Sequence, residues 1–187
     1  MKFFRRHLRS KPGISLVEVL VSTTLFVIIL LSMTEIFKMI LDSQRQAIAT
    51  QNVQENIKYF FEVISKEIRM AKRAGGGCSH LPAQKRFATS SNLYGDILYL
   101  KNYHDECVKY YLSEDNGVVR FTVDRGTDFG FLSPSKIAID DLHFLVHEEN
   151  GSQAYISINL SAHSVGREEN FSNMRVQTTI SSRYYRN

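Results

Sequence analysis

Proline and glycine are absent from Ile14 to Ala74, although the 187-residue chain has three prolines and ten glycines elsewhere. Those totals exclude a low-complexity chain. Because proline and glycine disfavour a helix interior most strongly, nothing in this segment demands a break. We predict one helix of about 60 residues, close to 90 Å long at about 1.5 Å per residue. Gly75-Gly76-Gly77 would end it, since glycine readily adopts the left-handed conformation that follows many helices.

Acidic residues are absent from the first 13 residues, MKFFRRHLRSKPG, which include five lysines and arginines. Without these five, the chain's 23 basic residues become 18, against 19 acidic residues. The formal net charge of +4 therefore belongs to the N-terminal end. Direct nucleic-acid binding is not expected, because it needs basic residues clustered on the folded part.

The basic end directly precedes an 18-residue apolar run, from Ile14 to Leu31, in which Glu18 is the only charged residue. A helix of that length spans roughly 27 Å, near the thickness of a bilayer core, and a basic flank is typical of the cytoplasmic side. A cleaved secretory signal would have a shorter apolar core followed by an A-x-A pattern, which residues 33–38 lack. We predict a membrane-spanning segment that stays with the mature protein. An acid inside it is costly, which points to a function for Glu18.

Past Leu31, apolar residues recur at three- and four-residue steps between polar and charged ones, which is the pattern of a helix with one apolar face. They are Ile36, Met39, Ile40, Ala47, Val53, Ile57, Phe60, Ile64, Ile68 and Ala71. The first third of the helix is therefore expected to be apolar all round. Its remainder is expected to pack an apolar face on the domain that follows.

From residue 75 onward the apolar pattern favours strands. Six are expected, at residues 96–100, 108–112, 118–123, 142–147, 154–160 and 174–182. Asn116-Gly117 lies between two of them and is a strong hairpin signal, and residues 148–152 join a second hairpin. Residues 83–92 and 161–173 are expected to be longer loops. The predicted fold class is α+β, with one long helix packed on an antiparallel sheet.

Catalytic motifs are also absent: the sequence has no G-x-S-x-G, no H-E-x-x-H and no glycine-rich phosphate loop after a strand. His143 and His147 lie four residues apart in a predicted strand and share a face, but no third metal ligand accompanies them. We interpret them as surface or half-buried histidines. Neither an enzyme, a cofactor nor a metal is expected.

Cysteine occurs only twice, at Cys78 and Cys107, and both lie beyond the apolar run. In an exported domain they can form a disulfide, whereas in the cytosol they would stay free thiols. A zinc site is a third alternative, because His80 and His104 lie near them in sequence. The C-x-H spacing of Cys78 and His80 is a poor match to structural zinc sites. The disulfide is the interpretation we favour.

The segment KPG followed by ISLVEVLV, residues 11–21, resembles the processing site of type IV prepilins and pseudopilins. In that family a prepilin peptidase cuts after the glycine that ends a short basic leader. The new N-terminal residue is then N-methylated, and a glutamate stands at the fifth mature position. The resemblance implies cleavage between Gly13 and Ile14, methylation of Ile14, and pairing of Glu18 with the terminal amine of a neighbouring subunit.

The resemblance also implies a domain organisation. Residues 1–13 would be the leader, 14–36 the transmembrane and filament-core helix, 37–74 its amphipathic continuation, and 75–187 a β-rich periplasmic or extracellular head. The apolar half of the helix would protrude from that head. Glu35 stands where major pilins commonly have a proline, and the cysteines lie mid-chain, so the minor members are the better match. These are the PilW-like minor pilins and the J-type minor pseudopilins of type II secretion.

A minor pilin or pseudopilin is a structural subunit that primes assembly of a filament or lies at its tip. The partners implied are the prepilin peptidase, other major and minor pilins or pseudopilins, and inner-membrane lipid before assembly. The implied location is the bacterial inner membrane, with the N-terminus cytoplasmic and the head periplasmic, and afterwards the pilus or pseudopilus. The alternatives are a component of a competence pseudopilus and a signal-anchored exported binding domain outside any filament.

Overall fold

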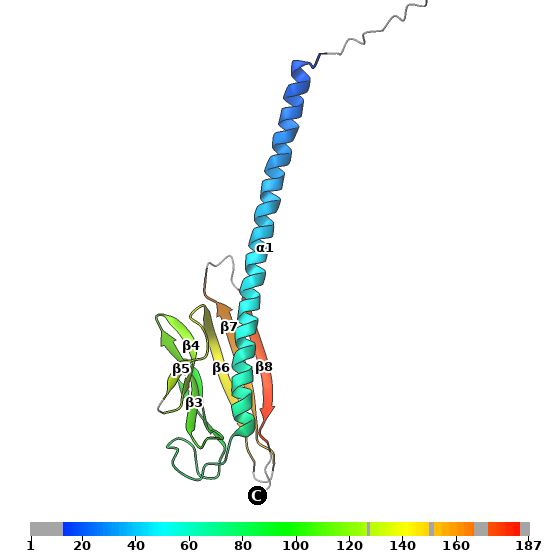
Figure 1. Cartoon of the computed structure of the whole chain (residues 1–187). Coiled ribbons are helices and arrows are strands. Elements are labelled where there is room, and N and C mark those ends of the chain that lie inside the picture. The colour runs from blue at the N-terminus through cyan, green and yellow to red at the C-terminus, as the bar shows by residue number, and fades with distance from the viewer. Residues whose placement is uncertain (1–12, 127, 150–151, 167–171, 184–187) are drawn as a thin grey trace, which may run out of the picture. The chain divides into compact units, whose positions relative to one another are not determined.

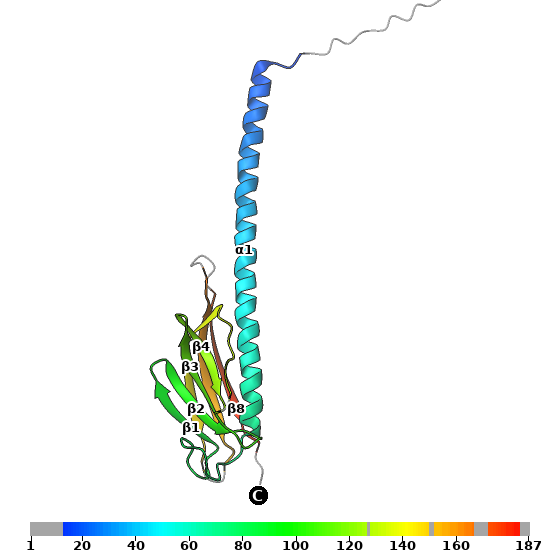
Figure 2. The ribbon, with the colours of Figure 1, turned by 60° about the vertical axis from the view of Figure 1, so that its left-hand side comes forward.

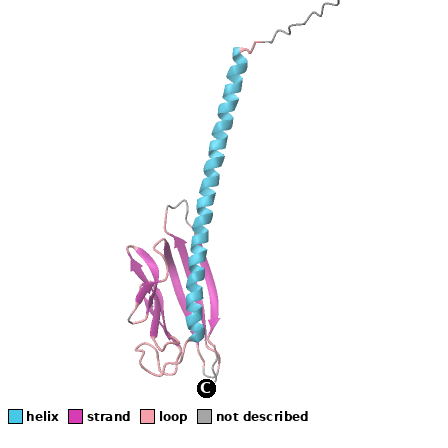
Figure 3. Ribbon diagram, viewed as in Figure 1, coloured by secondary structure: helices cyan, strands magenta, loops and turns pink. Residues whose placement is uncertain are grey.

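The computed structural model describes residues 13–126, 128–149, 152–166 and 172–183; residues 1–12 of the predicted leader lie outside them. The fold class is α+β, with one long helix and, in the described residues, eight strands in two antiparallel sheets (Figures 1 and 3). Helix α1 covers Leu16–Met70. The chain divides into two compact units, residues 1–43 and residues 44–187.

The described part of the first unit is the apolar first half of α1. All of its residues from Gly13 to Ser43 are exposed except Asp42, which is half-buried. Phe26, Leu31 and Phe37, for example, each expose about three-fifths of their surface. α1 is the one described helix long and apolar enough to cross a membrane, which confirms the predicted long apolar N-terminal helix.

The second half of α1 belongs to the second unit and contributes one buried stripe to its core. The stripe comprises Val53, Ile57, Phe60, Ile64 and Ile68, all at most 5% exposed. Their steps of three and four residues place them on one helix face, as the sequence predicts.

The predicted end of the helix at the three glycines is wrong, because α1 ends at Met70. The Lys72 N–H donates to the Lys101 carbonyl (2.9 Å), and the Ala74 N–H donates to the Lys85 carbonyl (2.8 Å). These residues therefore pair with other parts of the domain in place of the next helical turn.

The first sheet is an antiparallel meander of five strands in the order β1-β2-β3-β4-β5. They are β1 (Phe87–Asn92), β2 (Gly95–Lys101), β3 (Cys107–Asp115), β4 (Val118–Asp124) and β5 (Phe129–Phe131). The predicted hairpin at Asn116-Gly117 is confirmed: these two residues join β3 to β4 with φ of +52° and +80°. Positive φ at both positions fits a type I′ turn, whose twist matches that of the strands.

The second sheet has three antiparallel strands in the order β6-β7-β8. They are β6 (Ile137–His147), β7 (Tyr155–Ser164) and β8 (Asn173–Ser181). Both sheets and the buried stripe of α1 share one hydrophobic core. Figures 1 and 2 show the second half of α1 running beside the strands, and the rings of Phe60 and Phe121 in β4 meet at 4.0 Å between centroids.

The two sheets meet where the start of β2 approaches β6. A Cβ on Gly95 would lie 2.8 Å from the Leu142 carbonyl oxygen, and Gly95 has a φ of +146°. The next residue, Asp96, accepts a hydrogen bond from the Phe144 N–H (3.0 Å). Glycine is therefore required here twice over, by conformation and by space.

The strand predictions are correct for the six central segments but wrong elsewhere, and β6 begins at Ile137, five residues before the predicted start. Residues 83–92, expected to form a loop, include β1, and the sequence gives no prediction of β5. The second expected loop is shorter than predicted, because β7 continues to Ser164 and β8 begins at Asn173. The strands form two sheets where the sequence suggested one. In β1 only Phe87 is buried and Ser and Thr dominate, so this edge strand lacks an apolar alternation.

Replacing Gly95 by alanine should lower the free energy of unfolding by about 1–3 kcal/mol, because the methyl group meets the Leu142 carbonyl and φ is positive. Chemical denaturation of the full chain in detergent, followed by tyrosine fluorescence, measures the change. Gly130→Ala is the matched control, since Gly130 has open space around it and no positive φ, and it should be nearly neutral. Equal stability of the two variants would contradict the close approach of the sheets.

Candidate functional site

The predicted cleavage site lies immediately before α1, on non-helical backbone. Gly13 and Ile14 are exposed, Ile14 by 75%. Apart from Gly13 itself and its two chain neighbours, no described atom lies within 4 Å of the position a Gly13 Cβ would occupy, so packing in the described structure does not require glycine there.

Ser15 and Glu18 form the start of α1. The Glu18 N–H donates to the Ser15 hydroxyl oxygen (3.2 Å), and the Val19 N–H donates to the Ser15 carbonyl (3.2 Å). Ser15 is therefore the N-cap, and Glu18 is the third helical residue, the spacing of a capping box. A carboxylate in the first turn also interacts favourably with the helix dipole. The N-cap was not predicted from the sequence, although the S-x-x-E pattern signals it.

Five hydroxyl side chains of the apolar half of α1 donate to carbonyl groups of the preceding helical turn. Ser22 donates to the Glu18 carbonyl (2.8 Å) and Thr34 to the Leu30 carbonyl (2.9 Å). Thr23, Thr24 and Ser32 make the same kind of bond to carbonyls three or four residues earlier. These bonds leave few free polar hydrogens on this surface, which suits surroundings without water.

The predicted disulfide is present: Cys78 is bonded to Cys107, with Cα atoms 5.7 Å apart. The bond ties the segment after α1 to the first residue of β3. The zinc alternative is not supported, since the His80 ring contacts Tyr99 (4.9 Å between centroids) and the His104 ring contacts Tyr103 (3.7 Å). Among the described residues no group of three or more His, Cys, Asp or Glu side chains is arranged to hold a metal ion.

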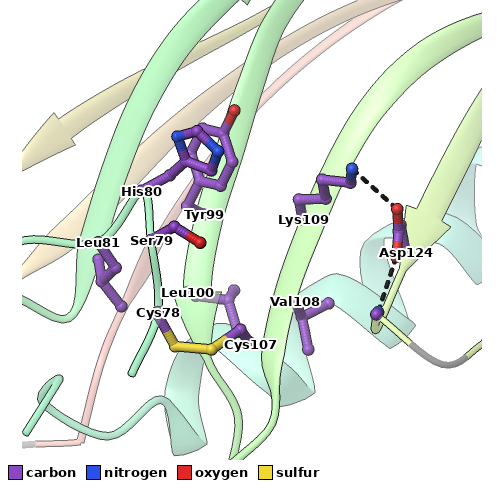
Figure 4. Close-up of a pocket in the computed structure, with 11 residues that line it drawn as sticks. Cys78, Ser79, His80, Leu81, Tyr99, Leu100, Cys107, Val108, Lys109 and Asp124 are labelled. Atoms are coloured by element: carbon purple, nitrogen blue, oxygen red, sulfur yellow. Dashed lines mark hydrogen bonds and ion pairs between the residues drawn. A yellow bond between two sulfur atoms is a disulfide. The ribbon is translucent and has the colours of Figure 1, made fainter. Parts of the chain in front are cut away.

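A pocket of about 300 Å³ lies beside the disulfide, on the first sheet (Figure 4). Its charged side chains are Lys109 and Asp124, which form an ion pair of 2.8 Å. The hydrogen bond from Lys109, followed by that from the Gly126 N–H, lowers the pKa of Asp124, and the Asp124 hydrogen bond raises the pKa of Lys109. Both groups therefore stay charged near neutral pH and neutralise each other.

An ion pair that the sequence pattern does not reveal joins Glu67, which is buried on α1, to the half-buried Arg125 directly after β4. Arg125 donates to Glu67 (2.9 Å), whose other carboxylate oxygen lies buried without a hydrogen bond to any described group. Burial, and then the nearby Glu67 charge, raise the pKa of the fully buried Tyr110. Glu67 follows Ile64 by three residues, so its place on the apolar stripe was a signal for a buried acid.

The two histidines of β6 have separate partners in the described structure. His143 contacts Asp96 through Nδ1 (3.2 Å) and Asp141 through Nε2 (3.1 Å). The His147 ring stacks on Tyr155 (4.6 Å between centroids). Both histidines are exposed.

The β-rich domain therefore contains a disulfide and ion-paired charges. Contacts within the chain do not account for Gly13 or for the exposed apolar half of α1. No protein-family model, curated protein or solved structure matches the chain. Function has to be inferred from the chain's own residues.

Replacing Cys78 and Cys107 together by alanine should lower the free energy of unfolding by about 3–4 kcal/mol, because the bond joins residues 29 apart in sequence. Denaturation of the full chain, with and without reductant, measures this. The reduced native sequence is the control and should match the variant. If oxidised native protein is no more stable than the variant, the Cys78–Cys107 disulfide does not stabilise the β-rich domain.

Proposed function

We propose that the chain is the precursor of a minor pilin or pseudopilin, a subunit that primes a type IV pilus or type II secretion pseudopilus or lies at its tip. The observation that carries the proposal is the contrast in burial between the two halves of α1. Up to Leu41 its large apolar side chains are exposed, and from Val53 its apolar residues form the core of a β-rich domain. The same uninterrupted helix thus offers one part to an external apolar environment and the other to its own head.

Gly13 and Ile14 are the second support. The peptide bond between them lies in exposed, non-helical backbone, as a protease substrate requires, and no described group near Gly13 explains its lack of a side chain. A prepilin peptidase would hydrolyse this bond, leaving a carboxylate on Gly13 and an amine on Ile14. A glycine lets the backbone enter a narrow peptidase cleft.

Glu18 supplies the contact between subunits. In the filament the apolar part of α1 would pack against equivalent helices, so protein contacts replace lipid contacts. A carboxylate surrounded by apolar helices is costly unless it is paired. The methylated amine of Ile14 on a neighbouring subunit is the partner we propose, and the pairing would fix the axial register of the two helices.

Before assembly, the apolar part of α1 would span the bacterial inner membrane. The basic residues 1–13 place the N-terminus in the cytoplasm and the head in the periplasm, where the disulfide can form. On this proposal the head is a structural part and not an enzyme. Its partners are the prepilin peptidase and other pilins or pseudopilins.

The strongest alternative is a signal-anchored exported binding domain, because a membrane-spanning helix alone would serve it equally well. Such a protein needs no cleavage at Gly13. Within the pilin-like proposal, neighbouring genes for pilus assembly, type II secretion or competence would distinguish the PilW-like, J-type and DNA-uptake versions.

Mass spectrometry of the mature protein from its native host should find an N-terminus at Ile14 with one extra methyl group. Gly13→Val should leave the full-length precursor uncleaved, because a side chain there obstructs the peptidase. Gly75→Val, at a glycine outside the processing segment with open space around it, is the control and should be cleaved normally. An intact Met1 terminus in mature protein would overturn the processing proposal and favour the signal-anchored domain.

Glu18→Gln should be cleaved normally but incorporated into filaments far less than the native chain, because the amide keeps the size and loses the charge. Immunoblotting of sheared filaments against membrane fractions measures the ratio. Ser15→Ala is the control, since it removes the helix cap and keeps the carboxylate. If Ser15→Ala fails and Glu18→Gln assembles normally, Glu18 serves the helix terminus and not a neighbouring subunit.

A further inference from the structure

Strand β8 forms a free edge of the second sheet. It pairs with β7 along all nine of its residues, from Asn173 to Ser181. Its backbone makes no hydrogen bond to any other described part of the chain.

The register shows which backbone groups face that free edge. The Ser182 N–H donates to the Ala154 carbonyl (2.9 Å), and the Ser164 N–H donates to the Ser172 carbonyl (3.1 Å). Both pairs continue the β7–β8 register, so even-numbered residues of β8 form the hydrogen-bonded pairs with β7. The N–H and C=O groups of the odd-numbered residues therefore point outward. We call these the outer residues: Asn173, Arg175, Gln177, Thr179 and Ser181, all of them exposed.

The other sheet edges are shorter or better covered. Along β6, Asp96 accepts from the Phe144 N–H, and a register shift lies between Ile139 and Asp141. At the start of β1, the Glu148 carboxylate accepts from the Phe87 N–H (3.4 Å). Strand β5 has only three residues. Among the described edges, β8 is thus the longest regular one.

Strand β8 also lacks the features that usually keep an edge from pairing. It contains no proline, glycine or register shift, and Arg175 is its only charged residue. No acidic residue occurs from Ser172 to Arg183. On the side facing the core, Met174 and Val176 are half-buried against the hydrophobic cluster.

We propose that β8 is a docking edge for an extended segment of another polypeptide, added as a further strand of the second sheet. The outer residues would exchange backbone hydrogen bonds with it, which is the usual mode of β-strand addition. Its alternate side chains would be apolar beside Met174 and Val176. A carboxylate would lie opposite Arg175, the one charge in the edge.

Charge complementarity favours such a segment over a second copy of the chain. The β8 strand of a second copy brings another Arg175 and no carboxylate. The proposal does not depend on processing at Gly13, so a negative result for peptide docking and a negative result for the proposed function can be told apart.

The test uses the full chain in detergent and a synthetic nine-residue peptide, capped at both ends, with valine at alternate positions and glutamate or threonine between. Amide hydrogen exchange should slow by about tenfold or more at Arg175, Gln177 and Thr179 on addition of the peptide. Even-numbered amides, already bonded to β7, should change little. A peptide with lysine in place of glutamate should protect more weakly.

Two variants isolate the edge. Gln177→Pro removes an outward N–H without removing a bond to β7 and should abolish the protection. Gln177→Asp, which keeps the backbone donor, should weaken it by charge repulsion. Asn159→Asp is the matched control, because Asn159 pairs with Gln177 one strand further from the edge, and it should retain most of the protection.

Three results would overturn the proposal. One is unchanged exchange of the outer residues at saturating peptide. Another is equal protection in Gln177→Pro. The third is slowed exchange that appears without peptide and grows with protein concentration, together with dimers in sedimentation, since the edge would then pair with a second copy.

Discussion

The buried stripe of α1 is the interaction on which the second unit depends. The core residues of both sheets meet the stripe in one cluster, with Phe60 in contact with Phe121 of the first sheet. Each large apolar side chain buried there stabilises the fold by about 1.5–3 kcal/mol. The Glu67–Arg125 ion pair and the hydrogen bond from the Arg183 N–H to the Arg69 carbonyl connect α1 to the segments that follow β4 and β8. Without the helix, the inner faces of both sheets would lose part of their cover.

The other half of α1 is also helical, but its apolar side chains are not covered by the rest of the described chain. Its exposed apolar residues, from Leu16 to Leu41, include aromatic and branched side chains on all sides of the helix, so no single contact within the chain could cover them. A helix that is apolar all round belongs in a membrane or among other helices. The hydroxyls that bond to preceding carbonyls agree with that environment. No proline or glycine interrupts α1 between these two parts.

The sequence was informative where one periodicity persists and failed where packing interrupts it. The stripe from Val53 to Ile68 and the turn at Asn116-Gly117 follow local rules, so both could be predicted. Strand β6 could not be predicted in full, because the register shift between Ile139 and Asp141 reverses which residues face inward. Ile137 and Ile139 are buried before the shift, and Leu142 and Phe144 after it. The two sheets approach one another at contacts such as Gly95 against Leu142, which join residues far apart in sequence and so leave no local pattern.

For the candidate site, the resemblance predicts roles for Gly13, Ile14 and Glu18, and the structure adds a local physical reason for one of them. Glu18 lies in the first turn of α1, where its carboxylate interacts favourably with the helix dipole. Cleavage after Gly13 would place a new ammonium group on Ile14, two residues before the helix begins. A positive charge at that end of a helix is unfavourable by about 0.3–1 kcal/mol. A carboxylate in the same turn, from its own chain or a neighbour, would offset that cost. Glu18 thus suits the helix both before and after the proposed cut.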